Sequence, residues 1–224
     1  MQPHPSVVVF DVNETLSDMA PMAERFAEVG APELAARLWF AVLLRDGFAV
    51  AAAGGNEPFA KLAEGALRVV LAGTSLNRSA DEAAAHVLSG FAGLGVHPDV
   101  PEGVRILRRQ GLRLVTLTNG SADVADGLLT RAGLRGEFER LLSVEDAAAW
   151  KPAPAAYAHA ARACSVSTEQ MLLVAVHPWD IHGAHQAGMR TGWIARQQTR
   201  YPDYFAAPDL QAQGLAALAE QVVS

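Results

Sequence analysis

The sequence feature that most constrains the fold is a short apolar run that ends in an acidic residue near the start of the chain. Residues Val7–Phe10 are four consecutive apolar residues, three of them β-branched, and Asp11 follows directly. Such a run predicts a strand buried on both faces, as in a parallel sheet. Ligands bind at the carboxyl ends of the strands in sheets of this kind. Because a desolvated carboxylate needs partners, Asp11 is expected to belong to a functional site.

The second half of the chain alternates between strand and helix patterns. Strands are predicted at 112–117, within 138–144, at 171–176 and at 191–195, and helices at 101–109, 124–132, 154–164, 181–187 and 215–222. This alternation predicts a parallel sheet with helices on both faces. The expected fold class is therefore α/β, with a doubly wound, Rossmann-like sheet.

Residues 18–94 interrupt the alternation and contain no convincing strand. Four helices are predicted there: one ends at Gly30, and the others begin near Pro32, Pro58 and Ser79. The second helix is expected to bury a stripe made of Leu34, Leu38, Val42 and Leu43. We therefore expect a core domain of residues 1–17 and 95–224 and a helical cap domain of residues 18–94. The cap would lie above the carboxyl edge of the sheet, where it could exclude water.

Composition narrows the range of partners and locations. The formal net charge is −6, which gives no reason to expect nucleic acid or an anionic membrane as a partner. Cys164 is the only cysteine, so a disulfide framework is impossible and a reducing, cytoplasmic location is expected. The first residues lack the basic and apolar regions of a secretory leader, and no apolar run is long enough to span a bilayer.

Polar residues lie at the same expected edge of the sheet in four places. Asp11 ends the first strand, Thr118 and Asn119 end the second, Lys151 lies on a loop after the third, and Asp180 follows the fourth. Each has an ordinary explanation, as turn, cap or solvated loop residue. Together they form a site for a small anionic substrate. A lysine between two carboxylates would keep both ionised.

Four segments carry a resemblance to a known family. Phe10–Leu16 (FDVNETL), Leu117–Ser121 (LTNGS), Trp150–Pro152 (WKP) and His177–Asp180 (HPWD) occur in this order, with the helical insert after the first. They resemble the four motifs of the haloacid dehalogenase (HAD) superfamily and, within it, those of the type II 2-haloacid dehalogenases. The resemblance covers nearly the whole chain. It implies a HAD-type core with an inserted helical cap.

The resemblance implies a hydrolase of small 2-haloalkanoic acids. Asp11 matches the nucleophile that displaces halide and leaves an aspartyl ester, which water hydrolyses to the 2-hydroxy acid. Lys151 matches the lysine that neutralises and orients the nucleophile. Asp180 matches the acid that fixes this lysine and helps to prepare the water. The resemblance also implies a homodimer.

The remaining site residues are assigned to substrate binding. Thr118 and Asn119 match the pair that holds the substrate carboxylate, and the other expected substrate-binding residues are Val12, Asn13, Phe40, His177 and Trp179. No metal and no cofactor are expected for a dehalogenase.

Two other functions remain as alternatives. A HAD-type phosphatase would use an acid at position 13 as the general acid for the leaving alcohol and another at position 176 to help bind Mg²⁺, but Asn13 and Val176 stand there. A non-catalytic carboxylate-binding protein on the same fold is disfavoured because Asp11, Lys151 and Asp180 are all retained.

The sequence also departs from the dehalogenase pattern. The family places an arginine after a cap tryptophan to receive the halide, whereas Phe40 follows Trp39 here. Arg37 and Arg45 are the nearby substitutes. His177 stands where asparagine is usual, and it is either a proton shuttle near neutral pH or a helix-entry histidine bonded to the backbone.

Overall fold

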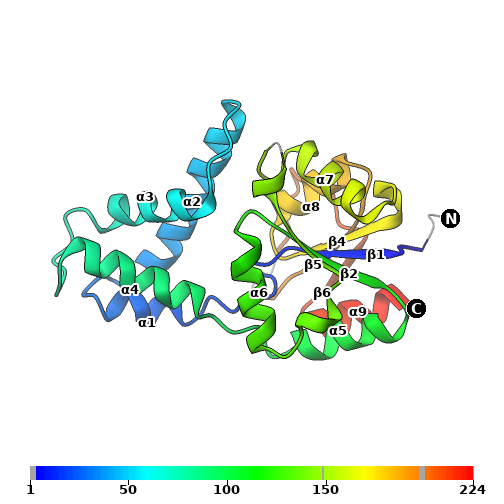
Figure 1. Cartoon of the computed structure of the whole chain (residues 1–224), viewed down its shortest axis with the longest axis horizontal. Helices are drawn as coiled ribbons and strands as arrows, with labels where there is room; N and C mark the ends of the chain where they lie inside the picture. Colours follow the sequence, from blue (N-terminus) through cyan, green and yellow to red (C-terminus); the bar gives the residue numbers. More distant parts are fainter. Residues whose placement is uncertain (1–3, 148, 197–199, 224) are drawn as a thin grey trace.

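A parallel sheet forms the centre of the larger part of the molecule (Figure 1). The computed structural model describes residues 4–147, 149–196 and 200–223. Within these residues the sheet has six strands in the order β3-β2-β1-β4-β5-β6. Their bounds are β1 Val7–Phe10, β2 Arg113–Thr118, β3 Arg140–Ser143, β4 Met171–Ala175, β5 Arg190–Ile194 and β6 Leu210–Ala212. The predicted α/β class with a parallel sheet is confirmed.

Strand β1 lies in the middle of the sheet, as its sequence predicts. All four of its residues are buried, and Val9 pairs with Val115 of β2 on one side and with Leu173 of β4 on the other. The two faces of β1 pack into different clusters, with Val8 and Phe10 in one and Val7 and Val9 in the other. A strand with neighbours on both edges and both faces needs apolar side chains throughout.

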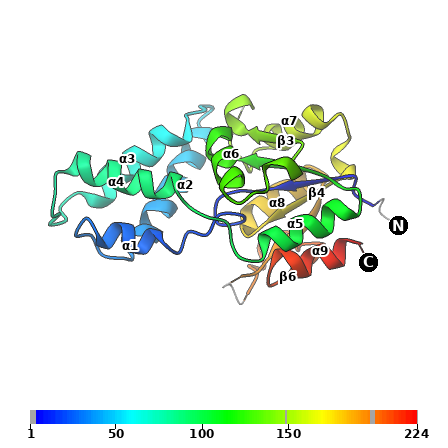
Figure 2. The same ribbon diagram turned by 60° about the horizontal axis from the view of Figure 1, so that its bottom comes forward.

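Helices cover both faces of the sheet. The face of Val8 and Phe10 is covered by α5 Val100–Arg109, α6 Ala122–Arg131 and α9 Leu215–Val223. The opposite face is covered by α7 Pro154–Cys164 and α8 Pro178–Gln186. Figure 2 shows α5 and α9 together on one side of the sheet and α7 on the other. No helix in the described part of the chain is long and apolar enough to cross a membrane.

Four further helices extend beyond the carboxyl edge of the sheet (Figure 1). They are α1 Met22–Ala27, α2 Ala35–Ala52, α3 Phe59–Leu71 and α4 Ala80–Ala92. Two connecting segments join them to the sheet, and these segments meet in an antiparallel bridge between Ser17 and Val96. The predicted start of α4 is confirmed, because Ser79 and Glu82 form a reciprocal capping box. We refer to residues 18–94 as the cap.

The predicted buried stripe of α2 is wrong at its first turns. Leu34 and Leu38 are 70% and 54% exposed, whereas Trp39 is fully buried. The indole of Trp39 packs against Phe26 and Phe91, and its Nε1–H donates to the carbonyl oxygen of Ala63 at 2.9 Å. The large indole with a hydrogen-bonding group therefore decides which face of α2 is buried, and the two leucines face outward.

Two smaller differences concern the last third of the chain. Helix α8 begins at Pro178, three residues before the expected start, so Asp180 lies in its first turn. Strand β6 was not predicted, because only one of its three residues is buried and such a short segment has no clear pattern.

Candidate active site

Three charged side chains meet at the carboxyl edge of the sheet. Asp11 ends β1, Asp180 lies in the first turn of α8 after β4, and Lys151 comes from the loop after β3. The Lys151 ammonium donates to Asp11 Oδ1 at 2.9 Å and to Asp180 Oδ2 at 2.6 Å. Lys151 and Asp180 are fully buried and Asp11 is 3% exposed. The sequence predicted this convergence because all three residues follow strands of one parallel sheet.

Two hydroxyl groups complete the arrangement, and neither was among the predicted site residues. Thr15 Oγ1 donates to Asp11 Oδ2 at 2.6 Å and accepts from the Val176 N–H at 3.1 Å. Tyr157 of α7 donates its hydroxyl hydrogen to Asp180 Oδ1 at 2.7 Å. Thr15 was recognisable within the first motif, four residues after Asp11. Tyr157 could not be recognised as a site residue from the sequence, because a tyrosine on an amphipathic helix is usually a packing residue of the core.

The ammonium between the two acids controls their protonation. Burial by itself would raise the pKa of Asp11, but the charges of Lys151 and His177 and the hydrogen bond from Thr15 outweigh it and hold that pKa below its ordinary value. Burial and repulsion from Asp11 raise the pKa of Asp180 despite its contact with Lys151. Burial would lower the pKa of Lys151, but the two carboxylates raise it. The ammonium is therefore charged, and Asp11 is the carboxylate held in its ionised form.

The second motif supports the lysine loop. Asn119 Nδ2 donates to the carbonyl oxygen of Lys151 at 3.2 Å, and its Oδ1 accepts from the Lys151 N–H at 2.9 Å. The hydroxyl oxygen of Thr118 accepts from the Gly120 N–H at 2.9 Å. The structure thus brings Asn119 to the site as a clamp on the backbone of Lys151, and its contact with a substrate carboxylate stays a prediction.

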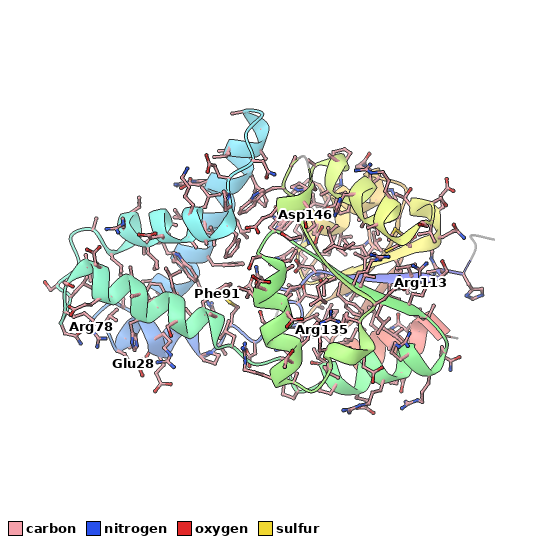
Figure 3. The ribbon with its side chains drawn as sticks, in the orientation of Figure 1. Glu28, Arg78, Phe91, Arg113, Arg135 and Asp146 are labelled. Atoms are coloured by element: carbon pink, nitrogen blue, oxygen red, sulfur yellow. The ribbon has the colours of Figure 1, made fainter. Side chains whose placement is uncertain are left out.

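A cavity of about 200 Å³ opens between the cap and the sheet edge. The cap supplies an apolar wall from α3 and α4, which includes Phe91 at the end of α4 that faces α6 (Figure 3). The core supplies Thr118, Gly120 and Ser121 together with Val12 and Asn13, the two residues directly after Asp11. The space is lined almost wholly by apolar atoms, with Thr118 and Ser121 among the few polar residues at its core side, and it suits a small molecule with an apolar substituent.

Comparison with known proteins identifies the family. A family model described as a haloacid dehalogenase-like hydrolase matches residues 5–188. The chain belongs to this family.

The relatives and solved structures within this haloacid dehalogenase-like family include several dehalogenases. Haloacetate dehalogenase H-2 of Moraxella sp. (strain B) is 36% identical over 121 residues, 54% of this chain and 54% of that protein. The match thus spans about half the length of that relative. The (S)-2-haloacid dehalogenase of Pseudomonas putida is 29% identical over 220 residues, 97% of this chain and 96% of that protein. A crystal structure of an L-2-haloacid dehalogenase has a TM-score of 0.93 at 31% identity and covers 99% of this chain and 100% of that one.

The family pattern of a cap arginine is replaced here by an aromatic contact. Phe40 of α2 is buried and stacks on His177, with ring centroids 6.3 Å apart, and His177 stacks on Trp179 at 5.0 Å. Arg37 and Arg45 are both exposed, and Arg45 pairs with Asp46 at 2.8 Å. Whether either arginine replaces the missing one stays a prediction.

The site of a phosphatase metal is also altered. Val176, at the position where a phosphatase has an acid, is 6% exposed and presents an alkyl side chain. Among the residues that the structure describes, no group of three or more His, Cys, Asp or Glu side chains is placed to hold a metal ion.

Proposed function

We propose that this protein is a hydrolytic dehalogenase of small 2-haloalkanoic acids. The observation that carries the proposal is the buried Asp11–Lys151–Asp180 triplet, with the ammonium 2.9 Å from one carboxylate and 2.6 Å from the other. An ionised carboxylate beside a cavity can displace a leaving group from carbon without first losing a proton. The dehalogenase relatives of the family support the same conclusion.

In the first step, an Asp11 oxygen attacks the carbon that bears the halogen. The new C–O bond forms as the carbon–halogen bond breaks, so that halide departs with the bonding electrons and an aspartyl ester remains. Lys151 orients the attacking carboxylate through the 2.9 Å bond to Oδ1, and Thr15 holds Oδ2 at 2.6 Å. With both oxygens fixed, little reorientation is needed before attack.

In the second step, water attacks the ester carbonyl carbon of Asp11. The bond between the carboxyl carbon of Asp11 and the substrate oxygen breaks, this oxygen takes up one of the two protons of the water, and the 2-hydroxy acid leaves. One oxygen of the regenerated Asp11 carboxylate comes from water. We assign to Asp180 the proton that the attacking water loses, because this second carboxylate shares the Lys151 ammonium with Asp11 and so lies next to the ester. Tyr157 and Lys151 hold the two oxygens of Asp180 in place.

We propose that the reaction needs no metal and no cofactor. The chemistry of the side chains supports this: Asn13 cannot serve as the acid that a phosphatase requires, and Val176 offers no oxygen to Mg²⁺. The substrate is then a small anion, bound by residues around Thr118 and the backbone after Asp11.

We further propose a cytoplasmic homodimer, with no nucleic acid or membrane as a partner. The exposed Leu34 directly before α2, Leu38 on its first turn and Val69 on α3 provide apolar surface for a second copy. Sedimentation velocity of the wild type and of Leu38→Glu tests this point, since a shift of the variant alone to the monomer supports the proposal and a monomeric wild type contradicts it.

The test of function compares two reactions of the same preparation. Chloride release from 2-chloropropionate is measured with EDTA, and phosphate release from p-nitrophenyl phosphate is measured with Mg²⁺. We expect chloride release that the chelator does not affect, and its loss in Asp11→Asn but not in the exposed control Asp146→Asn. Phosphate release alone, abolished by EDTA, would contradict the proposal. If the wild type binds 2-chloropropionate without turning it over, and Asp11→Asn binds it equally well, the protein is a carboxylate-binding protein.

A further inference from the structure

His177 lies directly beside the nucleophile. Its Nε2 is 3.1 Å from the carbonyl oxygen of Asn13, 3.7 Å from Asp11 Oδ2 and 3.7 Å from Glu14 Oε2. A carbonyl oxygen can accept a hydrogen bond but not donate one. This nitrogen therefore carries a hydrogen, which it donates to the Asn13 carbonyl oxygen, so the predicted backbone bond of a helix-entry histidine is confirmed.

Glu14 connects this buried imidazole with solvent. The side chain of His177 is 9% exposed, whereas that of Glu14 is 42% exposed. Glu14 has φ of 62°, in the left-handed region that residues other than glycine rarely adopt. His97 Nε2 contacts the Glu14 carbonyl oxygen at 3.1 Å and holds this backbone turn. The unusual turn thus accompanies a Glu14 carboxylate that contacts solvent and lies 3.7 Å from Nε2 of His177.

The neighbours of His177 fix its ring and define its charge environment. Phe40 of α2 and Trp179 of α8 stack on the ring at interplanar angles of 28° and 18°. The charged groups that face His177 are Asp11 and Glu14, and Lys151 lies beyond Asp11. From the cap, the neighbour is the uncharged Phe40. Phe40, which follows Trp39 where the family pattern has an arginine, therefore places an uncharged ring against His177.

We propose that His177 is the acid that protonates the leaving group, and that the substrates suited to this site are 2-substituted carboxylates whose leaving atom is basic and departs with a proton. The inference rests on the proposed function and concerns the leaving-group half of that same site. An arginine can stabilise a departing anion but does not give up its proton, whereas an imidazolium can do both.

The step balances with the groups present. Asp11 forms a C–O bond to C2, the bond from C2 to the leaving atom breaks, and the hydrogen on Nε2 of the imidazolium moves to that atom. For fluoride the products are the aspartyl ester, HF and neutral His177, which regains a proton from water through Glu14. Bromide is a weak base and leaves without a proton, so it requires less of His177.

The test uses (S)-2-fluoropropionate and (S)-2-bromopropionate, which give the same ester and differ only in the leaving atom. His177→Asn is compared with the wild type and with His185→Asn, a control on an exposed residue of the same helix. Proton transfer by a positioned acid contributes about 10²–10⁴-fold, so we expect His177→Asn to lose fluoride release at least about 100-fold, and bromide release by much less. Glu14→Gln should also lower fluoride release more than bromide release, and His185→Asn should leave both rates unchanged.

The ratio of fluoride release to bromide release separates a proton donor from a positioning residue. Equal losses of fluoride and bromide release in His177→Asn would overturn the inference and leave dehalogenation itself intact, with His177 as a positioning residue. Release of neither halide by the wild type would overturn the proposed function, and the inference with it.

Discussion

Replacement of Lys151 by methionine tests the electrostatic core of the site. The ammonium is fully buried and contacts two carboxylates at 2.9 and 2.6 Å, one of them fully buried and the other 3% exposed. Methionine keeps much of the volume but leaves both acids without their cation. Removal of one partner from a buried ion pair costs about 3–5 kcal/mol, and we expect the upper end of this range because two carboxylates lose their partner.

The predicted loss depends on pH in a specific direction. Without the ammonium, burial raises the pKa of both carboxyls in the folded variant above their unfolded values. A group with a raised folded pKa is destabilising when it must be ionised, and the penalty shrinks as the pH falls and the group takes up a proton. As the pH falls from about 8 to about 5, the free energy of unfolding of Lys151→Met should therefore approach that of the wild type.

Urea unfolding followed by circular dichroism at both pH values measures this difference. Lys61→Met is the matched control, because Lys61 forms an exposed ion pair with Glu57, and it should change stability little. The reasoning is refuted if Lys151→Met loses less than about 1 kcal/mol of unfolding free energy at the higher pH, because that is the value typical of a surface pair. An equal loss at both pH values would refute it too.

Two further substitutions probe the support of the site and of the cap–core contact. Thr15→Val removes the hydroxyl that donates to Asp11 at 2.6 Å and accepts from the Val176 N–H, so it should lower stability by about 1–3 kcal/mol and raise the pKa of Asp11. The acid limb of the pH–rate profile should then move to higher pH, and an unmoved limb would contradict the role of Thr15. Gly47→Ala places a Cβ against the Trp150 ring and should cost about 1–3 kcal/mol by overpacking. Gly65→Ala on the exposed side of α3 meets no atom within 4 Å and should raise the melting temperature slightly, and equal effects of the two changes would contradict the packing argument.

The sequence was sufficient to predict every strand of the described sheet except β6, and the meeting of its key side chains. A buried run such as Val7–Phe10 allows one interpretation, a central parallel strand. Once the strands are parallel, the residues that follow them share an edge, and topology alone brings Lys151 close to Asp11 over 140 positions.

Features that depend on side-chain orientation were not predictable in this way. The left-handed backbone of Glu14 has no signature in its residue type, so its approach to His177 appears only in the structure. The hydroxyl of Tyr157 meets Asp180 because α7 and α8 pack on the same face, and the rotation of each helix is set by its neighbours. For the same reason the face of α2 was predicted wrongly, since the fit of Trp39 against α3 outweighs the count of leucines.

Mass spectrometry after one turnover in oxygen-18 water tests the central claim most directly. With enzyme in excess over 2-chloropropionate, the account predicts one heavy oxygen in the peptide that contains Asp11 and none in the lactate formed, because water attacks the carboxyl carbon of the ester. Heavy oxygen in the lactate, with an unlabelled Asp11 peptide, would show that water attacks the substrate carbon directly and would contradict covalent catalysis by Asp11.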